Sequence, residues 1–232
     1  KDQIFLTTNP TFGYYSPCSE MRGMNKITCS YIGDDFKFPI KEFEEKIIQH
    51  NPKLVFICNP NNPTGTVLPA IDIIKLASIN KNALIVVDEL YEKFNGDSLL
   101  NLIDFEINKN IVIIQSLSKT AGLAGLRIGF TFGHKNLIQY INKVTGPYDV
   151  NSFAVIATLA ALKDKYYIDN YVLEVKKARE WIMNKFKSTN IRNHFSGGNY
   201  FLIWPNKNPE ILIEKMREKG ILIRSMKNKK DI

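Results

Sequence analysis

The sequence is poor in the residues that cross-link chains or bind metals. In 232 residues it has three cysteines and three histidines, namely Cys18, Cys29, Cys58, His50, His134 and His194. An odd, sparse set of cysteines without a C-x-x-C pair argues against a disulfide framework and is typical of reduced thiols in a cytoplasm. The histidines lie far apart and show no metal-ligand spacing, so we expect no metal site.

Long apolar runs and nucleotide fingerprints are also missing. No apolar run approaches the roughly 18 residues of a membrane span, so we expect no membrane association. Neither G-x-G-x-x-G nor a Walker A lysine occurs, which argues against a nucleotide-binding oxidoreductase. The formal net charge is +8, but the basic residues are scattered apart from 227-KNKK-230, and no nucleic-acid motif accompanies them. We therefore read them as a solvated surface and expect no nucleic-acid partner.

Short strand-like segments alternate with helical ones in the first 134 residues. Strands are predicted at 4–8, 27–31, 54–58, 84–88, 111–115 and 127–132, and helices at 40–50 and 69–80. The three strands from 54 to 115 are nearly continuous apolar runs, which is typical of strands covered on both faces of a parallel sheet. The alternation predicts an α/β fold, a three-layer α/β/α domain with a mostly parallel sheet.

The pattern changes after residue 134. Helices are predicted near 135–144, 151–163 and 167–188, followed by a β-α-β piece made of 200–204, 208–219 and 221–224. We interpret this piece as part of a smaller α+β C-terminal domain. The expected division is a large domain over 1–170 and a partial small domain over 171–232.

Two polar segments follow predicted strands at positions where α/β sheets bind ligands. In 58-CNPNNPTG-65, two Asn-Pro steps and a Pro-Thr-Gly enforce a rigid turn that can hold the Asn62 amide towards a ligand. In 88-DELYEKF-94, Asp88 closes an apolar strand, and its carboxylate there needs a cationic or donor partner. Tyr91 points to the same cavity if the chain turns helically. A strand-end aspartate that caps a helix is the alternative reading of Asp88.

A third segment, 116-SLSKTAGLAGLRIGF-130, follows the strand 111–115. A lysine drawn into a pocket becomes a nucleophile towards carbonyls, which indicates that Lys119 reacts with an aldehyde. Ser116 and Ser118 offer hydroxyl donors, and Arg127 offers a charged fork for a phosphate. With Asp88 for a ring nitrogen, and Asn62 and Tyr91 for a ring oxygen, the segments together indicate pyridoxal phosphate.

The motifs and their order resemble the fold-type-I pyridoxal-phosphate aminotransferases, and most of all the histidinol-phosphate aminotransferase group. The resemblance spans nearly the whole chain and rests on 10-PTFGYY-15, NPNNPTG, DELYEKF and SLSKTAGLAGLRIGF. It implies that Lys119 binds the cofactor covalently and acts as the catalytic base. It assigns Asp88 to the ring nitrogen, Asn62 and Tyr91 to the ring oxygen, and the phosphate to Ser116, Ser118 and Arg127. Phe12 would stack on the ring, with plain core packing as the alternative.

The resemblance also implies substrate contacts and partners. Asn199 and Arg224 match substrate-binding positions of the smaller domain, although a surface ion pair would also explain Arg224. We expect an amino donor, a 2-oxo acid acceptor and a cytoplasmic homodimer. The sequence begins with Lys1 rather than Met, and family segments are missing at both ends, so we expect an incomplete chain. A decarboxylase of threonine phosphate or serine phosphate and a non-catalytic aminotransferase-like binding domain remain open alternatives.

Overall fold

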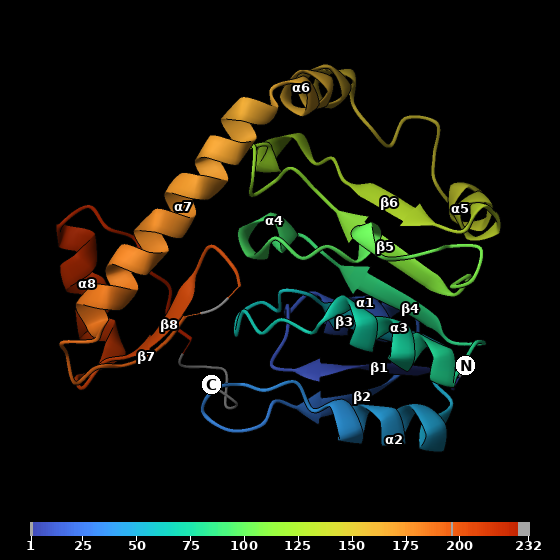
Figure 1. Cartoon of the computed structure of the whole chain (residues 1–232), viewed down its shortest axis with the longest axis horizontal. Coiled ribbons are helices and arrows are strands. Elements are labelled where there is room, and N and C mark those ends of the chain that lie inside the picture. Colours follow the sequence, from blue (N-terminus) through green and yellow to red (C-terminus); the bar gives the residue numbers. More distant parts are fainter. Residues whose placement is uncertain (1, 196, 227–232) are drawn as a thin grey trace.

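A six-stranded sheet forms the centre of the molecule (Figure 1). The computed structural model describes residues 2–195 and 197–226. The strand order is β2-β1-β3-β4-β5-β6, with the first five strands parallel and β6 antiparallel to β5. The strands are β1 (Ile4–Asn9), β2 (Asn25–Ser30), β3 (Leu54–Cys58), β4 (Leu84–Asp88), β5 (Ile111–Gln115) and β6 (Phe130–Gly133). The prediction of a mostly parallel α/β sheet is confirmed.

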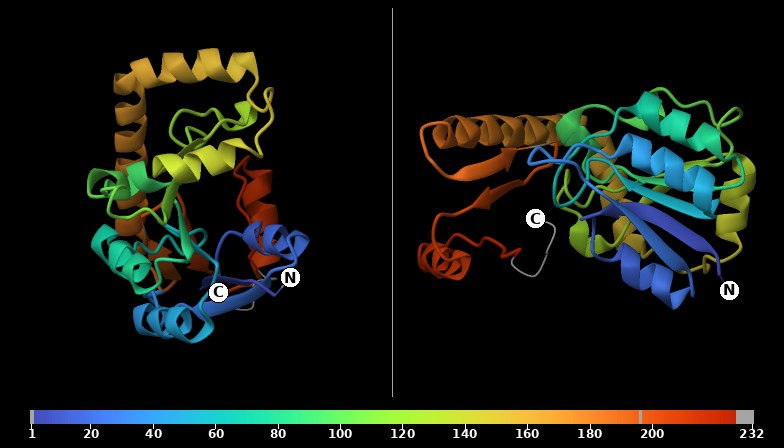
Figure 2. Two further views of the ribbon diagram at one scale, coloured as in Figure 1. Left: turned by 90° about the vertical axis from the view of Figure 1, so that its right-hand side faces the viewer. Right: turned by 90° about the horizontal axis from the view of Figure 1, so that it is seen from below.

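Helices cover both faces of this sheet, as the continuous apolar strands require. The helices α2 (Ile40–His50) and α3 (Ala70–Ile79) lie on one face, and α1 (Tyr15–Met21) lies on the other (Figure 2). The main core between the sheet and α2 and α3 contains Phe43, Ile57 and Ile113, each at most 1% exposed. Shorter elements follow β4 and β5, namely α4 (Glu92–Asn95), η1 (Leu99–Asn101) and η2 (Ala124–Leu126).

The chain then leaves the sheet through a series of helices. They are α5 (Lys135–Asn142), α6 (Ser152–Lys163) and the long α7 (Lys165–Phe186). Figure 1 shows α7 running from α6, beside the large sheet, to a second sheet of two antiparallel strands. This second sheet contains β7 (Arg192–Phe195) and β8 (Phe201–Trp204), and α8 (Pro209–Glu218) follows it. The proposed domain boundary at residue 170 falls inside α7 and stays a prediction.

Two of the predicted strands, 221–224 and 127–132, differ from the structure. The expected strand 221–224 is irregular, because β8 pairs with β7 and the described residues place no further strand beside it. The strand β7 matches none of the strands predicted from the sequence. The strand expected at 127–132 begins only at Phe130, because Arg127 has a left-handed backbone conformation (φ +58°) that a strand does not accept. In the described part of the chain, no helix is long and apolar enough to cross a membrane.

The parallel topology brings four strand ends together. The strands β1, β3, β4 and β5 are consecutive neighbours, and their carboxyl ends therefore lie at one edge of the sheet. In the register, Cys58 at the end of β3 is opposite Asp88 at the end of β4, and Asp88 is opposite Ile114 near the end of β5. Segments that are far apart in the sequence thus share this edge.

Candidate active site

The loops that leave this sheet edge carry most of the predicted site residues. The loop after β1 contains Phe12, the loop after β3 contains Asn62, and β4 ends in Asp88 with Tyr91 just beyond it. The turn after β5 contains Ser116, Ser118 and Lys119. Their common position follows from the strand order, since each segment comes directly after a strand whose carboxyl end lies at this edge. The structure therefore places side chains from four separate segments around one edge.

Asp88 is a largely buried carboxylate held by two donors. The Tyr15 hydroxyl donates a hydrogen bond of 2.6 Å to Oδ2, and the Leu90 backbone N–H donates one of 3.1 Å to Oδ1. Burial raises the pKa of Asp88, and the two donors lower it in part. No salt bridge to Asp88 occurs among residues 2–195 and 197–226. Such a carboxylate favours a cationic partner from outside the chain.

Asn62 and Tyr91 form a second polar pair, between the loops after β3 and β4. Nδ2 of Asn62 donates to the Tyr91 hydroxyl at 2.9 Å. Because that hydroxyl oxygen accepts this bond, its own hydrogen is left to donate to a further acceptor. Burial raises the pKa of Tyr91, so the group stays a neutral donor at physiological pH. The pair can therefore present N–H and O–H donors to one oxygen atom.

The third polar group consists of two serine hydroxyls after β5. Oγ of Ser116 lies 2.6 Å from Oγ of Ser118 and donates to the Ile128 carbonyl oxygen at 3.0 Å. This second bond ties the serine pair to the residue that follows Arg127. The Arg127 guanidinium itself is exposed and donates to the Ala124 carbonyl oxygen at 2.9 Å, within its own loop. Its assignment to a phosphate stays a prediction.

The remaining residues predicted for the cofactor occupy the same edge. Lys119 is partly buried in the turn between Ser118 and the buried Thr120. Phe12 is 45% exposed, and its ring meets the Tyr15 ring edge-on with the centroids 5.4 Å apart. An exposed aromatic face next to Tyr15 and Asp88 is suited to stacking on a planar ligand.

The two residues predicted to bind substrate differ in position. Asn199 is half-buried two positions before β8, and its neighbour Tyr200 packs edge-on against Tyr91 with a centroid distance of 5.0 Å. Arg224 is exposed in the irregular segment after α8. The structure thus brings the segment of Asn199 to the site, and no contact between Arg224 and another residue of 2–195 or 197–226 assigns it a role. Both substrate roles stay predictions.

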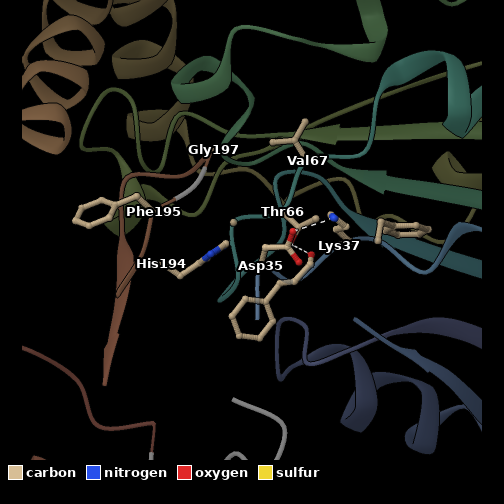
Figure 3. Close-up of a pocket in the computed structure, with 10 residues that line it drawn as sticks. Asp35, Lys37, Thr66, Val67, His194, Phe195 and Gly197 are labelled. Carbon is tan, nitrogen blue, oxygen red and sulfur yellow. Dashed lines mark hydrogen bonds and ion pairs between the residues drawn. The ribbon is translucent and has the colours of Figure 1, made fainter. Parts of the chain in front are cut away.

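A cavity of about 330 Å³ lies between the first strand of the second sheet and the loops after β2 and β3. Neither Asp88 nor Lys119 lines it. Figure 3 shows the His194 side chain of β7 pointing towards Asp35 and Thr66, and Phe195 also lines the cavity. The rings of His194 and Phe36 pack edge-on at 5.0 Å. The cavity adjoins the back of the loop that carries Asn62, through its lining residues Gly65 and Thr66.

Two functional contacts were not found from the sequence. Tyr15 lies inside 10-PTFGYY-15, but nothing in the sequence indicates that its hydroxyl reaches Asp88, which is 73 residues away. Asn61 is fully buried, and its amide donates to the Pro10 carbonyl oxygen and accepts from the Thr11 hydroxyl at 2.8 Å. Asn61 therefore joins the loop after β1 to the loop after β3. The only available signal was the density of Asn-Pro steps in NPNNPTG.

Comparison with known proteins identifies the family. A model of the family "Aminotransferase class I and II" matches residues 1–229. The chain belongs to this aminotransferase family. A curated relative, the histidinol-phosphate aminotransferase of Thermoanaerobacter sp. (strain X514), is 34% identical over 227 residues, which is 97% of this chain. The chain spans 62% of the length of that relative.

Solved structures share the aminotransferase fold. The histidinol-phosphate aminotransferase from Sinorhizobium meliloti, in complex with pyridoxal-5'-phosphate, matches with a TM-score of 0.84 and 24% identity, covering 96% of this chain and 62% of that one. The L-threonine-O-3-phosphate decarboxylase from Porphyromonas gingivalis matches with a TM-score of 0.82 and 23% identity, covering 100% and 69%. At these identities the matches concern the fold. Membership of the aminotransferase family supports pyridoxal phosphate as the cofactor.

The residues at the sheet edge fit this cofactor. The Asp88 carboxylate, which has no salt bridge in the described part of the chain, suits a protonated ring nitrogen. The Asn62–Tyr91 donor pair suits the ring oxygen, and the serine hydroxyls suit a phosphate. Lys119 lies in the turn next to those serines, where an aldehyde could reach its amine.

Proposed function

We propose that this protein catalyses pyridoxal-phosphate-dependent transamination, with L-histidinol phosphate as amino donor and 2-oxoglutarate as acceptor. The main support for pyridoxal-phosphate chemistry is the convergence of Asp88, the Asn62–Tyr91 pair, the two serines and Lys119 at one sheet edge. Membership of the aminotransferase family supports transamination as the reaction type. The 34% identical relative is a histidinol-phosphate aminotransferase, which supports the choice of donor. A cytoplasmic homodimer is part of the same proposal.

Asp88 controls the charge at the ring nitrogen. Pyridoxal phosphate, when bound, supplies an aldehyde that condenses with amines and a conjugated ring that accepts the electron pair of a bond at Cα. The ionised Asp88 carboxylate keeps the ring nitrogen protonated, which makes electron uptake favourable. Tyr15 and the Leu90 N–H fix the carboxylate by one hydrogen bond on each oxygen, so its orientation is set before the cofactor binds.

The other polar residues hold the cofactor at its remaining functional groups. Asn62 and Tyr91 donate to the ring oxygen, and the position of each is fixed by the bond between them. Ser116 and Ser118 donate to the phosphate after their hydroxyls rotate, and Arg127 adds charge from the adjacent loop. Phe12 covers one face of the ring and limits its contact with water.

Lys119 is the proposed catalytic residue of the chain. Its Nζ would hold the cofactor covalently, and its amine, when free, would serve as the general base that takes the proton from the substrate Cα. Asn199 and Arg224 are proposed to hold the anionic ends of the substrate.

A substrate panel tests this proposal. The full-length protein is loaded with pyridoxal phosphate and given histidinol phosphate, an aromatic amino acid or threonine phosphate, each with 2-oxoglutarate. We expect glutamate to form fastest with histidinol phosphate. Equal or faster glutamate formation from another donor would contradict the assigned substrate, and no glutamate from any donor would contradict transamination.

The same panel separates the two rival functions. A decarboxylase releases carbon dioxide from threonine phosphate or serine phosphate whether or not 2-oxoglutarate is present. A non-catalytic binding domain yields neither glutamate nor carbon dioxide, even when it is loaded with cofactor. Both bond cleavages require the same Asp88 and Lys119, so only the products distinguish them.

A further inference from the structure

Tyr200 connects the second sheet to the loop that carries Asn62. Its hydroxyl donates a short hydrogen bond to the Asn61 carbonyl oxygen, 139 residues away. The same oxygen also accepts the Gly65 N–H, so both of its lone pairs are used. Burial raises the pKa of Tyr200 far above its usual range, so the hydroxyl remains a donor throughout the pH range of an enzyme. The contact comes from the residue directly after Asn199.

The ring of Tyr200 contacts the other half of the donor pair. It meets the Tyr91 ring edge-on with the centroids 5.0 Å apart. A Cβ atom added to Gly198 would lie 2.5 Å from the Tyr200 ring, so this ring position depends on a glycine there. One side chain thus contacts Tyr91 through its ring and the backbone beside Asn62 through its hydroxyl.

The second sheet also meets this loop at Gly197. The Gly197 N–H donates to the Gly65 carbonyl oxygen at 3.0 Å. Next to this bond lies the cavity of Figure 3, which is lined by Gly65, Thr66 and Gly197. Two hydrogen bonds therefore join the second sheet to the loop, and the one from Tyr200 ends on the residue next to Asn62.

We infer that Tyr200 is a positioning residue that sets the Asn62–Tyr91 donor pair against the ring oxygen of the cofactor. This inference rests on the proposed function. The position of the donor pair affects the pKa of the nitrogen that joins Lys119 to the cofactor. Donors to the ring oxygen stabilise negative charge there and weaken its hold on the proton of the nitrogen that joins Lys119 to the cofactor. If Asn62 and Tyr91 are less firmly positioned, the nitrogen holds this proton more tightly, and its titration midpoint moves to higher pH.

The test is a pH titration of the absorbance of bound pyridoxal phosphate in the full-length protein. Tyr200→Phe keeps the ring and removes only the hydroxyl. We expect its titration midpoint to rise by about 0.5 pH unit and the cofactor Kd to increase about threefold to tenfold. Tyr171→Phe is the matched control, because Tyr171 is a partly exposed tyrosine whose ring packs on Phe94 instead. It should leave the midpoint unchanged.

The outcomes separate this inference from the proposed function. A Tyr200→Phe midpoint equal to that of the wild type, with only a lower Tm, would show a purely structural role and overturn the inference while the proposed function stands. A wild-type protein with no absorbance from bound cofactor would overturn both. Gly198→Ala, which displaces the ring, should raise the midpoint in the same direction as Tyr200→Phe, and an unchanged midpoint there would also count against the inference.

Discussion

The Tyr15 hydroxyl donates a hydrogen bond of 2.6 Å to Oδ2 of Asp88, across 73 residues of sequence. Tyr15 is 8% exposed, and burial raises its pKa far above the usual range, so it is a permanent donor. Burial also raises the pKa of Asp88, and the bond from Tyr15 acts in the opposite direction. The bond from Tyr15 therefore makes Asp88 easier to ionise than burial alone would allow.

Tyr15→Phe should make Asp88 harder to ionise. The variant removes one donor to a carboxylate, a bond typically worth about 1.5–3 kcal/mol, so we expect a loss of roughly 10-fold to 100-fold in kcat/KM. The acid limb of the pH profile should move to higher pH, because the folded pKa of Asp88 rises further. An acid limb at the wild-type position would contradict the role given to this contact.

Asp88→Asn should stabilise the cofactor-free protein while it removes activity. The folded pKa of Asp88 is raised above its unfolded value, so its favourable contribution to stability is present at low pH and is lost as the pH rises through the folded pKa. At pH 7.5 the ionised group is a net cost, and asparagine removes that cost. We expect a gain of about 1 kcal/mol, or roughly 2–4 °C in Tm, at pH 7.5.

The activity of Asp88→Asn should fall about 100-fold to 1000-fold, because the charge that faces the ring nitrogen is lost. Thermal unfolding of the cofactor-free protein at pH 7.5 and pH 4 checks the stability part. The advantage of the variant should shrink at pH 4. A variant less stable than the wild type at pH 7.5 would show that the two hydrogen bonds outweigh the cost of burial.

Ser118→Ala should weaken the binding of the cofactor phosphate. Loss of one hydroxyl donor to a charged group predicts a roughly tenfold higher Kd for pyridoxal phosphate. Pyridoxal, which has no phosphate, is the internal control, and its Kd should be unchanged. Ser116→Ala should in addition lower the Tm of the cofactor-free protein, because the Ser116 hydroxyl donates to the Ile128 carbonyl oxygen in that state. Equal weakening of both ligands by Ser118→Ala would argue against a phosphate contact.

The sequence predicted the sheet and the location of the site because both depend on local patterns. The apolar runs that end at Cys58, Asp88 and Gln115 are strands of the expected length and direction. The polar residues that follow them meet because parallel strands share one carboxyl edge. Predicting the sheet and the location of the site therefore requires only the hydrophobic periodicity and the parallel topology that it favours.

The contacts that orient the site depend on side chains that meet only in the folded chain. Tyr15 with Asp88 and Tyr200 with Asn61 are separated by 73 and 139 residues, and no local pattern encodes such pairs. The wrong prediction of a strand at 221–224 came from a local pattern that has no partner strand in the described part of the chain. Its apolar residues look like a strand, but a strand also requires a hydrogen-bonded neighbour, which the described residues do not supply.

The most direct test of the proposed cofactor chemistry is the location of the covalent link. The full-length protein is loaded with pyridoxal phosphate, reduced with borohydride to make the link permanent, digested and analysed by mass spectrometry. The account predicts one modified lysine, Lys119, and no modification or cofactor absorbance in Lys119→Ala. A cofactor attached to another lysine, or a wild-type protein that takes up none, would contradict it.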